Sequence, residues 1–423
     1  MISYLFFGLV GYLLLLLAIA VMGEREQSWL RRIAQGPWVY TLSLAVYCTS
    51  WTFFGIVGSA TRAGTLYLAI YWGPMLGMLF GTVLLNRIFA IKRAYHITSI
   101  ADFISTRYYR SSTIAAMVTI FTSIGVAPYI ALQLKAISNS FKVLNDNSHD
   151  GVVFWAVEEF SALFLIVFTI LFGLRRLDIS EHHPGVILAM AFEGLIKLLA
   201  FIALGLFISY GLFDGLGDLF GQAESARQSG ELLHGFNNSV PVSTWLCYLF
   251  LSMNAFFFLP RQFQVMVVEN TDPEHVRTAQ WALPTYLFLI ILFVIPVTLG
   301  ALLLGLPSES ADSFVLLLPQ QYASPWLTFF VYVGGFSASM GMVVMSTIAI
   351  SVMMSNHLIL PIIEKLPSLS RLRRHLLPLR WWLALCVLAI CLIVLSATVS
   401  FLLAWGCYRL RRCCSLLPQR LAV

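Results

Sequence analysis

Long apolar runs constrain this chain more than any other feature. About 20 consecutive apolar residues cross the hydrocarbon core of a bilayer as a helix. Runs of this kind lie at residues 3 to 22, 38 to 60, 65 to 90, 113 to 138, 152 to 173, 184 to 212, 242 to 266, 279 to 305, 326 to 354 and 381 to 404. Because lipid offers no hydrogen bonds to an open backbone, these runs predict helices. We therefore expect an all-α membrane protein with about ten transmembrane helices.

The composition excludes a soluble protein. Of the 423 residues, 59% are hydrophobic and only 11% are Asp, Glu, Lys or Arg, whereas a soluble domain carries about 25% charged residues. The formal net charge of +6 comes from short clusters of Lys and Arg between the apolar runs. Such clusters set the topology of membrane proteins, so we expect no binding to nucleic acid.

The loop charges predict the orientation, because cytoplasmic loops collect Lys and Arg. With the amino terminus outside, most basic residues fall in inner loops, and Arg261 and Arg277 are assigned to one of these loops. The outer loops then hold only Arg62, Lys135, Lys142 and Arg227. We predict a multi-pass protein of the bacterial inner (cytoplasmic) membrane with its amino terminus outside.

The tail from residue 406 to 423 breaks this charge pattern. It would emerge outside, yet it is basic and holds three cysteines. We expect a disrupted or truncated reading frame here, and a natural short tail is the alternative. Residues 1 to 405 show no soluble domain and form one transmembrane domain.

Two spanning runs carry features that interrupt a helix. The run from 38 to 60 places Thr49, Ser50, Thr52 and Gly55 near its middle, and such residues either relax the backbone at a solute site or allow close helix packing. Pro260 interrupts the run at the start of the second half of the chain. A proline there breaks the helix at a binding site or only kinks it.

Glu193 and Lys197 lie four residues apart inside another spanning run. Charges at this depth are costly, so we expect them to form an ion pair with each other or to line a wet cavity, with Glu193 as a possible proton site. His182 and His183 precede Pro184 without a third ligand nearby, so no metal site is expected. No nucleophile and base at catalytic spacing are present, which argues against an enzyme.

Several segments resemble the sodium/solute symporter family. SIADFISTRY (99 to 108) is similar to a loop signature of that family, YCTSWTFFGIVGSA (47 to 60) to its first core helix, and SASMGMVVMSTIAISVMMSNHLI (337 to 359) to its eighth. Three longer strings, at 128 to 138, 172 to 201 and 258 to 270, resemble the symporter-like module at the amino terminus of transporter-fused (CbrA-like) sensor histidine kinases.

The resemblance implies a LeuT-like fold of two inverted five-helix repeats preceded by one extra helix. The extra helix would be 3 to 22 and the first repeat 38 to 212. The second repeat, from 242, contains only four spanning runs and is incomplete.

The resemblance also implies where a solute binds, between the broken first and sixth core helices. Thr49, Ser50 and Trp51 match substrate-side positions of the first core helix. Phe256 and Pro260 match the aromatic residue and the proline of the sixth. These five residues are the predicted substrate site.

A coupling-ion site follows from the same resemblance. The carbonyls of Ala45 and Cys48 match two sodium ligands, and the matching hydroxyl positions of the eighth core helix fall at Gly341 and Met342. Neither has a hydroxyl, and sodium requires hard oxygen ligands. We therefore expect proton coupling, with Glu193 as the acid, or ion-independent sensing in preference to sodium coupling, and no other cofactor.

The sequence thus favours a secondary transporter-like module. It would bind a small organic solute such as an amino acid, histidine by analogy with the sensor group, and move it by alternating access coupled to H+ or Na+. The alternative is the solute-sensing input domain of a two-component sensor histidine kinase whose kinase part is absent from this chain, so that the partners include a kinase and response regulator pathway. A third interpretation is a scaffold protein without a ligand.

Overall fold

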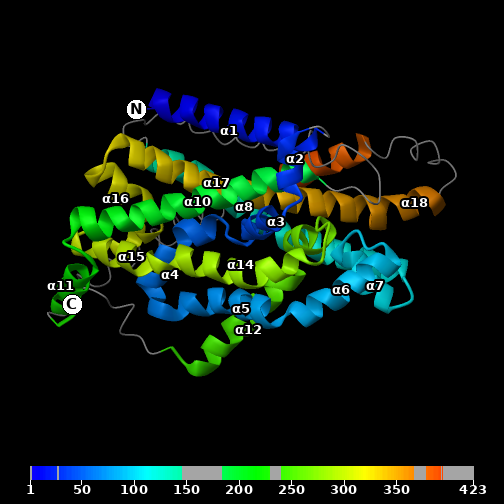
Figure 1. The fold of residues 1–423 in the computed structure, drawn as a ribbon, viewed down its shortest axis with the longest axis horizontal. Coiled ribbons are helices and arrows are strands. Elements are labelled where there is room, and N and C mark those ends of the chain that lie inside the picture. The colour runs from blue at the N-terminus through cyan, green and yellow to red at the C-terminus, as the bar shows by residue number, and fades with distance from the viewer. Residues whose placement is uncertain are drawn as a thin grey trace, which may run out of the picture.

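The computed structural model describes residues 2–25, 28–144, 183–228, 240–365, 378–391 and 393. Every regular element in these ranges is a helix, as expected for apolar segments that must satisfy their own backbone hydrogen bonds in lipid. Most of the long helices run along the length of the molecule, and α11 (Leu216–Gln228) turns across one end (Figure 1).

The elements in chain order are α1 (Ile2–Glu24), α2 (Trp29–Ala34), α3 (Pro37–Ser43), η1 (Leu44–Tyr47), η2 (Trp51–Gly55), α4 (Ile56–Ala63), η3 (Gly64–Leu66), α5 (Tyr67–Phe80), α6 (Thr82–Tyr95), α7 (Ile100–Arg107), α8 (Ser112–Leu144), α10 (Pro184–Phe207), η5 (Ile208–Leu212), α11, α12 (Val242–Phe258), α13 (Pro260–Phe263), η7 (Gln264–Val268), α14 (His275–Leu292), α15 (Val294–Leu303), η8 (Ser308–Ser313), α16 (Phe314–Tyr322), α17 (Pro325–Met354), η9 (Ser355–Ile359) and α18 (Leu360–Lys365). A further apolar helix covers Pro378–Cys391.

Six helical segments of the described ranges are long and apolar enough to cross a membrane. They are Phe7–Glu24, Trp51–Phe80, Ser112–Leu144, Pro184–Leu212, His275–Leu303 and Pro325–Lys365, and the bent pair Val242–Phe258 and Pro260–Val268 makes up to seven. Large apolar side chains such as Phe121 and Trp326 are 72% and 80% exposed, which suits a surface that faces lipid. The chain is a multi-pass membrane protein.

The predicted number of about ten spans is not reproduced within the described ranges, for two reasons. The predicted span 152 to 173 lies outside these ranges, as do half of 381 to 404 and the tail from 406 to 423. The predicted span 38 to 60 is divided into short pieces. The piece that begins with η2 continues through α4 and η3 into α5 and forms one span with it.

The first interruption separates η1 from η2. Cys48 has an extended conformation (φ −78°, ψ 102°), and side chains take over hydrogen bonds that a continuous helix would make. Thr52 Oγ1 accepts from the Thr49 amide at 3.2 Å, and Gln133 Oε1 accepts from the Ser50 amide at 3.0 Å. The hydroxyl-rich sequence therefore marks an opened backbone, as predicted.

The second interruption separates α12 from α13. Leu259 is extended (φ −62°, ψ 133°), and Pro260 begins the next helix. Proline has no amide hydrogen and pushes the preceding residue out of the helical conformation. The two helices meet at 51°, so Pro260 marks a break and not a gentle kink.

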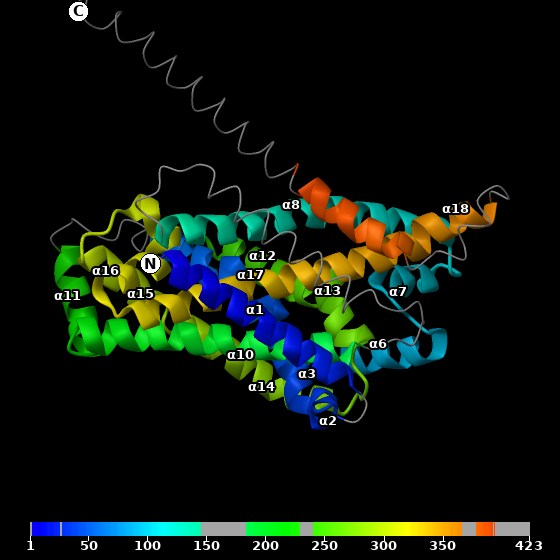
Figure 2. The same ribbon diagram turned by 90° about the horizontal axis from the view of Figure 1, so that it is seen from above.

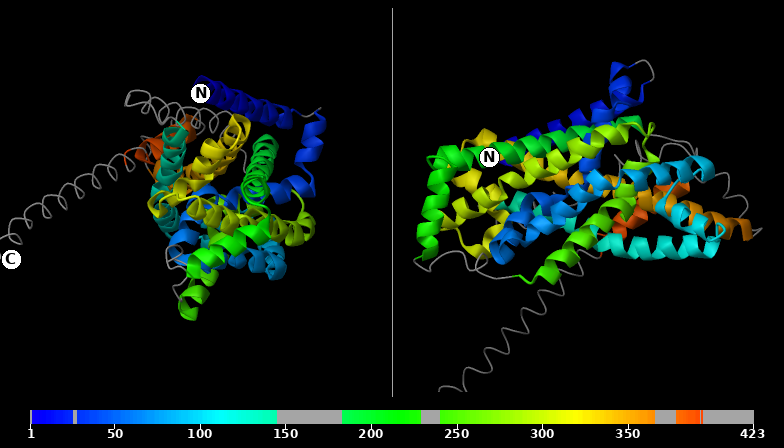
Figure 3. Two further views of the ribbon diagram at one scale, coloured as in Figure 1. Left: turned by 90° about the vertical axis from the view of Figure 1, so that its left-hand side faces the viewer. Right: turned by 60° about the horizontal axis from the view of Figure 1, so that its bottom comes forward.

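Close packing holds the interrupted helices in the bundle. α12 lies at an edge of the molecule with α5 beside it (Figures 1 and 3). At Gly73 of α5, an added Cβ atom would lie 2.0 Å from Ser252 Oγ and 2.6 Å from the Leu249 carbonyl oxygen. Only a glycine at position 73 lets α5 and α12 approach this closely. On another side of the bundle, α17 runs between α8 and α10 (Figure 2).

Candidate solute-binding site

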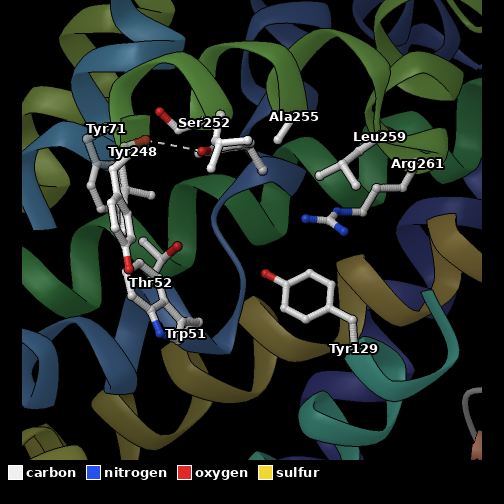
Figure 4. Close-up of a pocket in the computed structure, with 12 residues that line it drawn as sticks. Trp51, Thr52, Tyr71, Tyr129, Tyr248, Ser252, Ala255, Leu259 and Arg261 are labelled. Atoms are coloured by element: carbon white, nitrogen blue, oxygen red, sulfur yellow. Dashed lines mark hydrogen bonds between the residues drawn. The ribbon is translucent and has the colours of Figure 1, made fainter. Parts of the chain in front are cut away.

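A cavity of about 330 Å³ lies where the two interruptions meet α5 and α8 (Figure 4). Its lining residues are Tyr47, Trp51, Thr52, Ile70, Tyr71, Tyr129, Tyr248, Leu251, Ser252, Ala255, Leu259 and Arg261. Aromatic and aliphatic walls with a few polar groups are typical of sites for small organic molecules. The cavity is therefore the candidate solute site.

The predicted residues of the first interruption lie together, but only Trp51 lines this cavity. Ser50 and Trp51 line a neighbouring cavity of about 320 Å³. Thr49 is buried, and its hydroxyl shares a hydrogen bond of 3.1 Å with that of Tyr129. Ser50 Oγ donates to Gln133 Oε1 at 2.7 Å. Thr49 and Ser50 thus hold the opened backbone against α8.

The predicted residues of the second interruption do not line the cavity. Phe256 is 0% exposed, and its ring centroid lies 5.7 Å from that of Tyr47. Pro260 is buried at the start of α13. The face of α12 toward the cavity is formed by Tyr248, Leu251, Ser252 and Ala255, and Leu259 adds to the lining from the break itself. Phe256 lies on the adjacent face, so its predicted stacking on a solute does not fit this arrangement.

Arg261 is a residue of the site that sequence reasoning missed. It was assigned to a cytoplasmic loop, but its side chain is 2% exposed and lines the cavity. Its guanidinium carbon lies 5.0 Å from the centroid of the Tyr129 ring. The available signal was its position directly after Pro260 in an apolar segment, because a charge inside a membrane segment is a functional residue by default.

Two aromatic side chains belong to both cavities. Trp51 and Tyr129 line the first cavity and also the second, whose wall includes the polar residues Lys135, Asn139 and Asp312. Figure 4 shows Tyr129 beside Arg261, and Trp51 with Thr52 and Tyr71 on the other side of the space. Trp51 and Tyr129 therefore form the partition between an apolar and a more polar cavity.

Lys197 occupies the two carbonyls that were predicted to hold a coupling ion. Its Nζ donates to the carbonyl oxygen of Ala45 at 2.6 Å and to that of Cys48 at 2.9 Å. The residue is 3% exposed. The Ala45 carbonyl also accepts from the Cys48 amide at 2.9 Å, and the Cys48 carbonyl lies where the backbone opens. An ammonium group of the protein thus lies where the prediction placed a sodium ion.

The predicted ion pair between Glu193 and Lys197 is wrong. No nitrogen–oxygen distance between them falls within the 4.0 Å of an ion pair. The Lys197 ammonium turns to the backbone of the opened helix instead. Glu193 is 1% exposed, and its Oε1 has no hydrogen-bond partner among the described residues.

Of the two predicted positions on α17, Gly341 faces α10 and Met342 lies in the core. A Cβ atom on Gly341 would lie 2.6 Å from Glu193 Oε2 and 3.1 Å from Met190 Sδ. Gly341 therefore leaves the space that the Glu193 carboxyl group occupies. Met342 is 0% exposed and packs within the core. Neither residue presents a hydroxyl toward Ala45 and Cys48.

Polar contacts hold the far end of the second interrupted helix. His183 Nδ1 pairs with Glu269 Oε1 at 2.9 Å, and the His183 amide donates to Glu269 Oε2 at 2.8 Å. Gln264 Nε2 donates to the same carboxylate at 3.2 Å. His182 lies outside the described residues. His183 therefore connects the start of α10 to the end of η7.

Lys92 stabilises the same helix end. Its Nζ donates to the carbonyl oxygens of Val267 and Val268 at 2.8 Å and of Asn270 at 3.0 Å. Burial lowers the pKa of Lys92 to about 8, while the charge of Glu269 acts in the opposite direction. The ammonium form therefore predominates at neutral pH and binds the free carbonyls of the helix end.

Comparison with known proteins supports the symporter half of the resemblance. No family model matches the chain. The uncharacterized symporter YhjB of Bacillus subtilis (strain 168) is 23% identical over 298 residues, which is 68% of this chain and 56% of that relative. A solved structure of a Na+-coupled sialic acid symporter, in a substrate-bound outward-open state, superposes with a TM-score of 0.69. The fold is that of a symporter. The superposition covers 94% of this chain and 82% of that structure at 14% identity.

Proposed function

We propose that this chain is the membrane module of a secondary transporter, and that it binds a small organic solute such as an amino acid. The observation that carries the proposal is the cavity at the junction of two interrupted helices. Tyr47 and Trp51 contribute from the first interruption, and Leu259 and Arg261 from the second. A solute between two discontinuous helices can stabilise one arrangement of the two halves over another, which is the basis of alternating access.

Solute binding is expected to depend on Trp51. In the purified chain, a panel of amino acids that includes histidine should raise the unfolding temperature, and Trp51→Ala should weaken binding about ten-fold because an aromatic contact contributes about 1.5 kcal/mol. Isothermal titration calorimetry measures the affinity. Trp326→Ala is the control, since Trp326 is 80% exposed and is not among the lining residues. Equal losses in both variants, or no stabilisation of the wild type by any solute, would contradict the proposal.

For the coupling ion, we propose that no sodium binds between Ala45 and Cys48. Both carbonyls accept hydrogen bonds from Lys197, and a second cation there would meet the ammonium charge at contact distance. The coupling then uses protons, with the buried Glu193 as the acid, or the chain binds its solute without a coupled ion.

Affinity for the solute is therefore expected to be independent of sodium. Titrations in sodium chloride and in choline chloride at one ionic strength should agree within about two-fold, a free-energy difference well under 1 kcal/mol. Matched ionic strength removes general screening as a cause. A ten-fold gain in affinity with sodium would show that an ion site exists in spite of Lys197.

The second candidate function is the input domain of a sensor histidine kinase. The ammonium group of Lys197 is part of the protein, so it cannot move down an ion gradient and drive uptake. This favours solute binding without transport. The resemblance of three long segments to transporter-fused kinases supports the same function. Proteoliposomes separate the two functions: a transporter accumulates radiolabelled solute when a proton gradient is applied, and a sensor binds the solute without accumulation.

We also propose the bacterial inner membrane with the amino terminus outside. The support is the distribution of Lys and Arg between the loops, which survives the reassignment of Arg261 to the interior. The Lys92 and His183 contacts then lie at the cytoplasmic end of the bundle.

A further inference from the structure

Arg261 carries a positive charge that no described residue neutralises. Its side chain is 2% exposed, and its Nε and Nη1 atoms are buried without a hydrogen-bond partner among the described residues. No carboxylate of the described chain lies within 4.0 Å of its guanidinium.

An unpaired buried charge is among the most unfavourable groups that a protein can hold. Its removal from water costs several kcal/mol, and buried arginines are normally paired with carboxylates. The contact of Arg261 with the Tyr129 ring offsets part of this cost but supplies no negative charge. The next charged side chain adds a further positive charge. Lys197 donates to the carbonyl oxygen of Cys48, the residue that follows Tyr47 of the cavity wall.

The position of the guanidinium shows where a partner would lie. Figure 4 shows Arg261 pointing into the cavity from beneath Leu259, with Tyr129 beside it. The hydroxyl of Tyr71, which also lines the cavity, is buried without a hydrogen-bond partner in the described part of the chain. Two polar side chains from different helices, Arg261 and Tyr71, therefore line one cavity of about 330 Å³.

We propose that Arg261 binds the carboxylate of the solute, so that the substrate class is small organic acids and amino acids with a free carboxylate. The guanidinium is a planar fork that holds both oxygens of a carboxylate. One carboxylate supplies the single negative charge that Arg261 lacks. The rest of the solute lies against Trp51 and Tyr71. This inference rests on the proposed function of the cavity.

The test uses the purified chain and paired probes. Each amino acid of the panel is compared with its own carboxamide, which has the same shape without the negative charge. The variants are Arg261→Met, which removes the charge at similar length, and Arg261→Lys, which keeps the charge without the fork. Arg277→Met on α14 is the matched control, because Arg277 is exposed and away from the cavity.

We expect the wild type and Arg277→Met to bind a free amino acid at least about ten-fold more tightly than its carboxamide, since a hydrogen bond to a charged group is worth this factor or more. Arg261→Met should lose this preference, and Arg261→Lys should keep part of it. In the absence of solute, Arg261→Met should unfold at a higher temperature than the wild type, because it removes an unpaired buried charge.

Three results would decide against Arg261. Carboxamides that bind the wild type as tightly as the acids would overturn the carboxylate proposal and leave the solute cavity intact. A preference for acids that survives in Arg261→Met would place the carboxylate elsewhere. A lower unfolding temperature for Arg261→Met without solute would show a structural role for the charge. If neither acids nor carboxamides stabilise the wild type, the proposed function itself fails.

Discussion

Lys197→Ala is expected to lower the unfolding temperature of the chain more than any other single removal of a charge. The substitution deletes two hydrogen bonds from an ammonium group to the buried carbonyls of Ala45 and Cys48. Each hydrogen bond to a charged group contributes about 1.5–3 kcal/mol, so the loss should reach about 3 kcal/mol or more. Because the opened backbone at Cys48 borders Trp51, solute binding should weaken as well. Thermal unfolding in detergent and calorimetry measure both effects.

Sodium should restore part of this loss in the variant and have no such effect on the wild type. Alanine leaves a space beside two carbonyl oxygens, which are the hard ligands that sodium accepts. The unfolding temperature of Lys197→Ala is therefore compared in sodium and choline chloride. Lys365→Ala on α18 is the control, since Lys365 is exposed. A Lys197→Ala protein as stable as this control would show that the two hydrogen bonds contribute little to stability.

Gly73→Ala is expected to separate α5 from α12 and to remove solute binding. The added Cβ atom would lie 2.0 Å from Ser252 Oγ, 2.6 Å from the Leu249 carbonyl oxygen and 2.7 Å from the Met253 amide nitrogen. Two of these atoms are backbone and cannot rotate away, so the helices must move. Overpacking of this kind costs about 1–3 kcal/mol. α5 and α12 both line the cavity, so the affinity for solute should fall by about ten-fold or more.

The same substitution at Gly125 is the matched control. Gly125 lies inside α8, and nothing stands within 4 Å of its added Cβ atom. Alanine there should stabilise the helix by up to about 1 kcal/mol, because glycine loses more backbone freedom on folding. Opposite shifts of the unfolding temperature are therefore expected for the two variants. Equal shifts would indicate that α5 and α12 do not depend on a glycine contact.

The comparison of Lys197 with Glu193 shows a limit of prediction from spacing. Residues four apart lie on the same face of a helix, and this spacing predicted an ion pair. A spacing rule compares only the neighbours within one helix. It does not include the carbonyls of a second helix that opens next to it, and Lys197 binds those carbonyls instead.

Arg261 shows a second limit, which concerns the assignment of loops. The count of charges between apolar runs placed Arg261 with Arg277 on the cytoplasmic side, because each run was treated as one straight helix. In the structure the chain continues past Pro260 through α13 and η7 inside the bundle. Because the helix breaks at Pro260 and the chain continues inside the bundle, Arg261 lies in the protein interior and not in a loop.

The sequence by itself determined that the chain lies in lipid, that it is all-helical, and where its two helix breaks lie. Lipid requires long apolar helices with internal hydrogen bonds, and the residues that interrupt them, Pro260 and the hydroxyl cluster after Cys48, act on their own backbone. Only the tertiary structure decided that Phe256 does not line the cavity, that Arg261 does, and that Lys197 binds the carbonyl of Ala45. The physical reason is rotation about the helix axis. In a segment that is apolar on all sides, no hydrophobic stripe records which side faces the bundle, so the packing of neighbouring helices determines it.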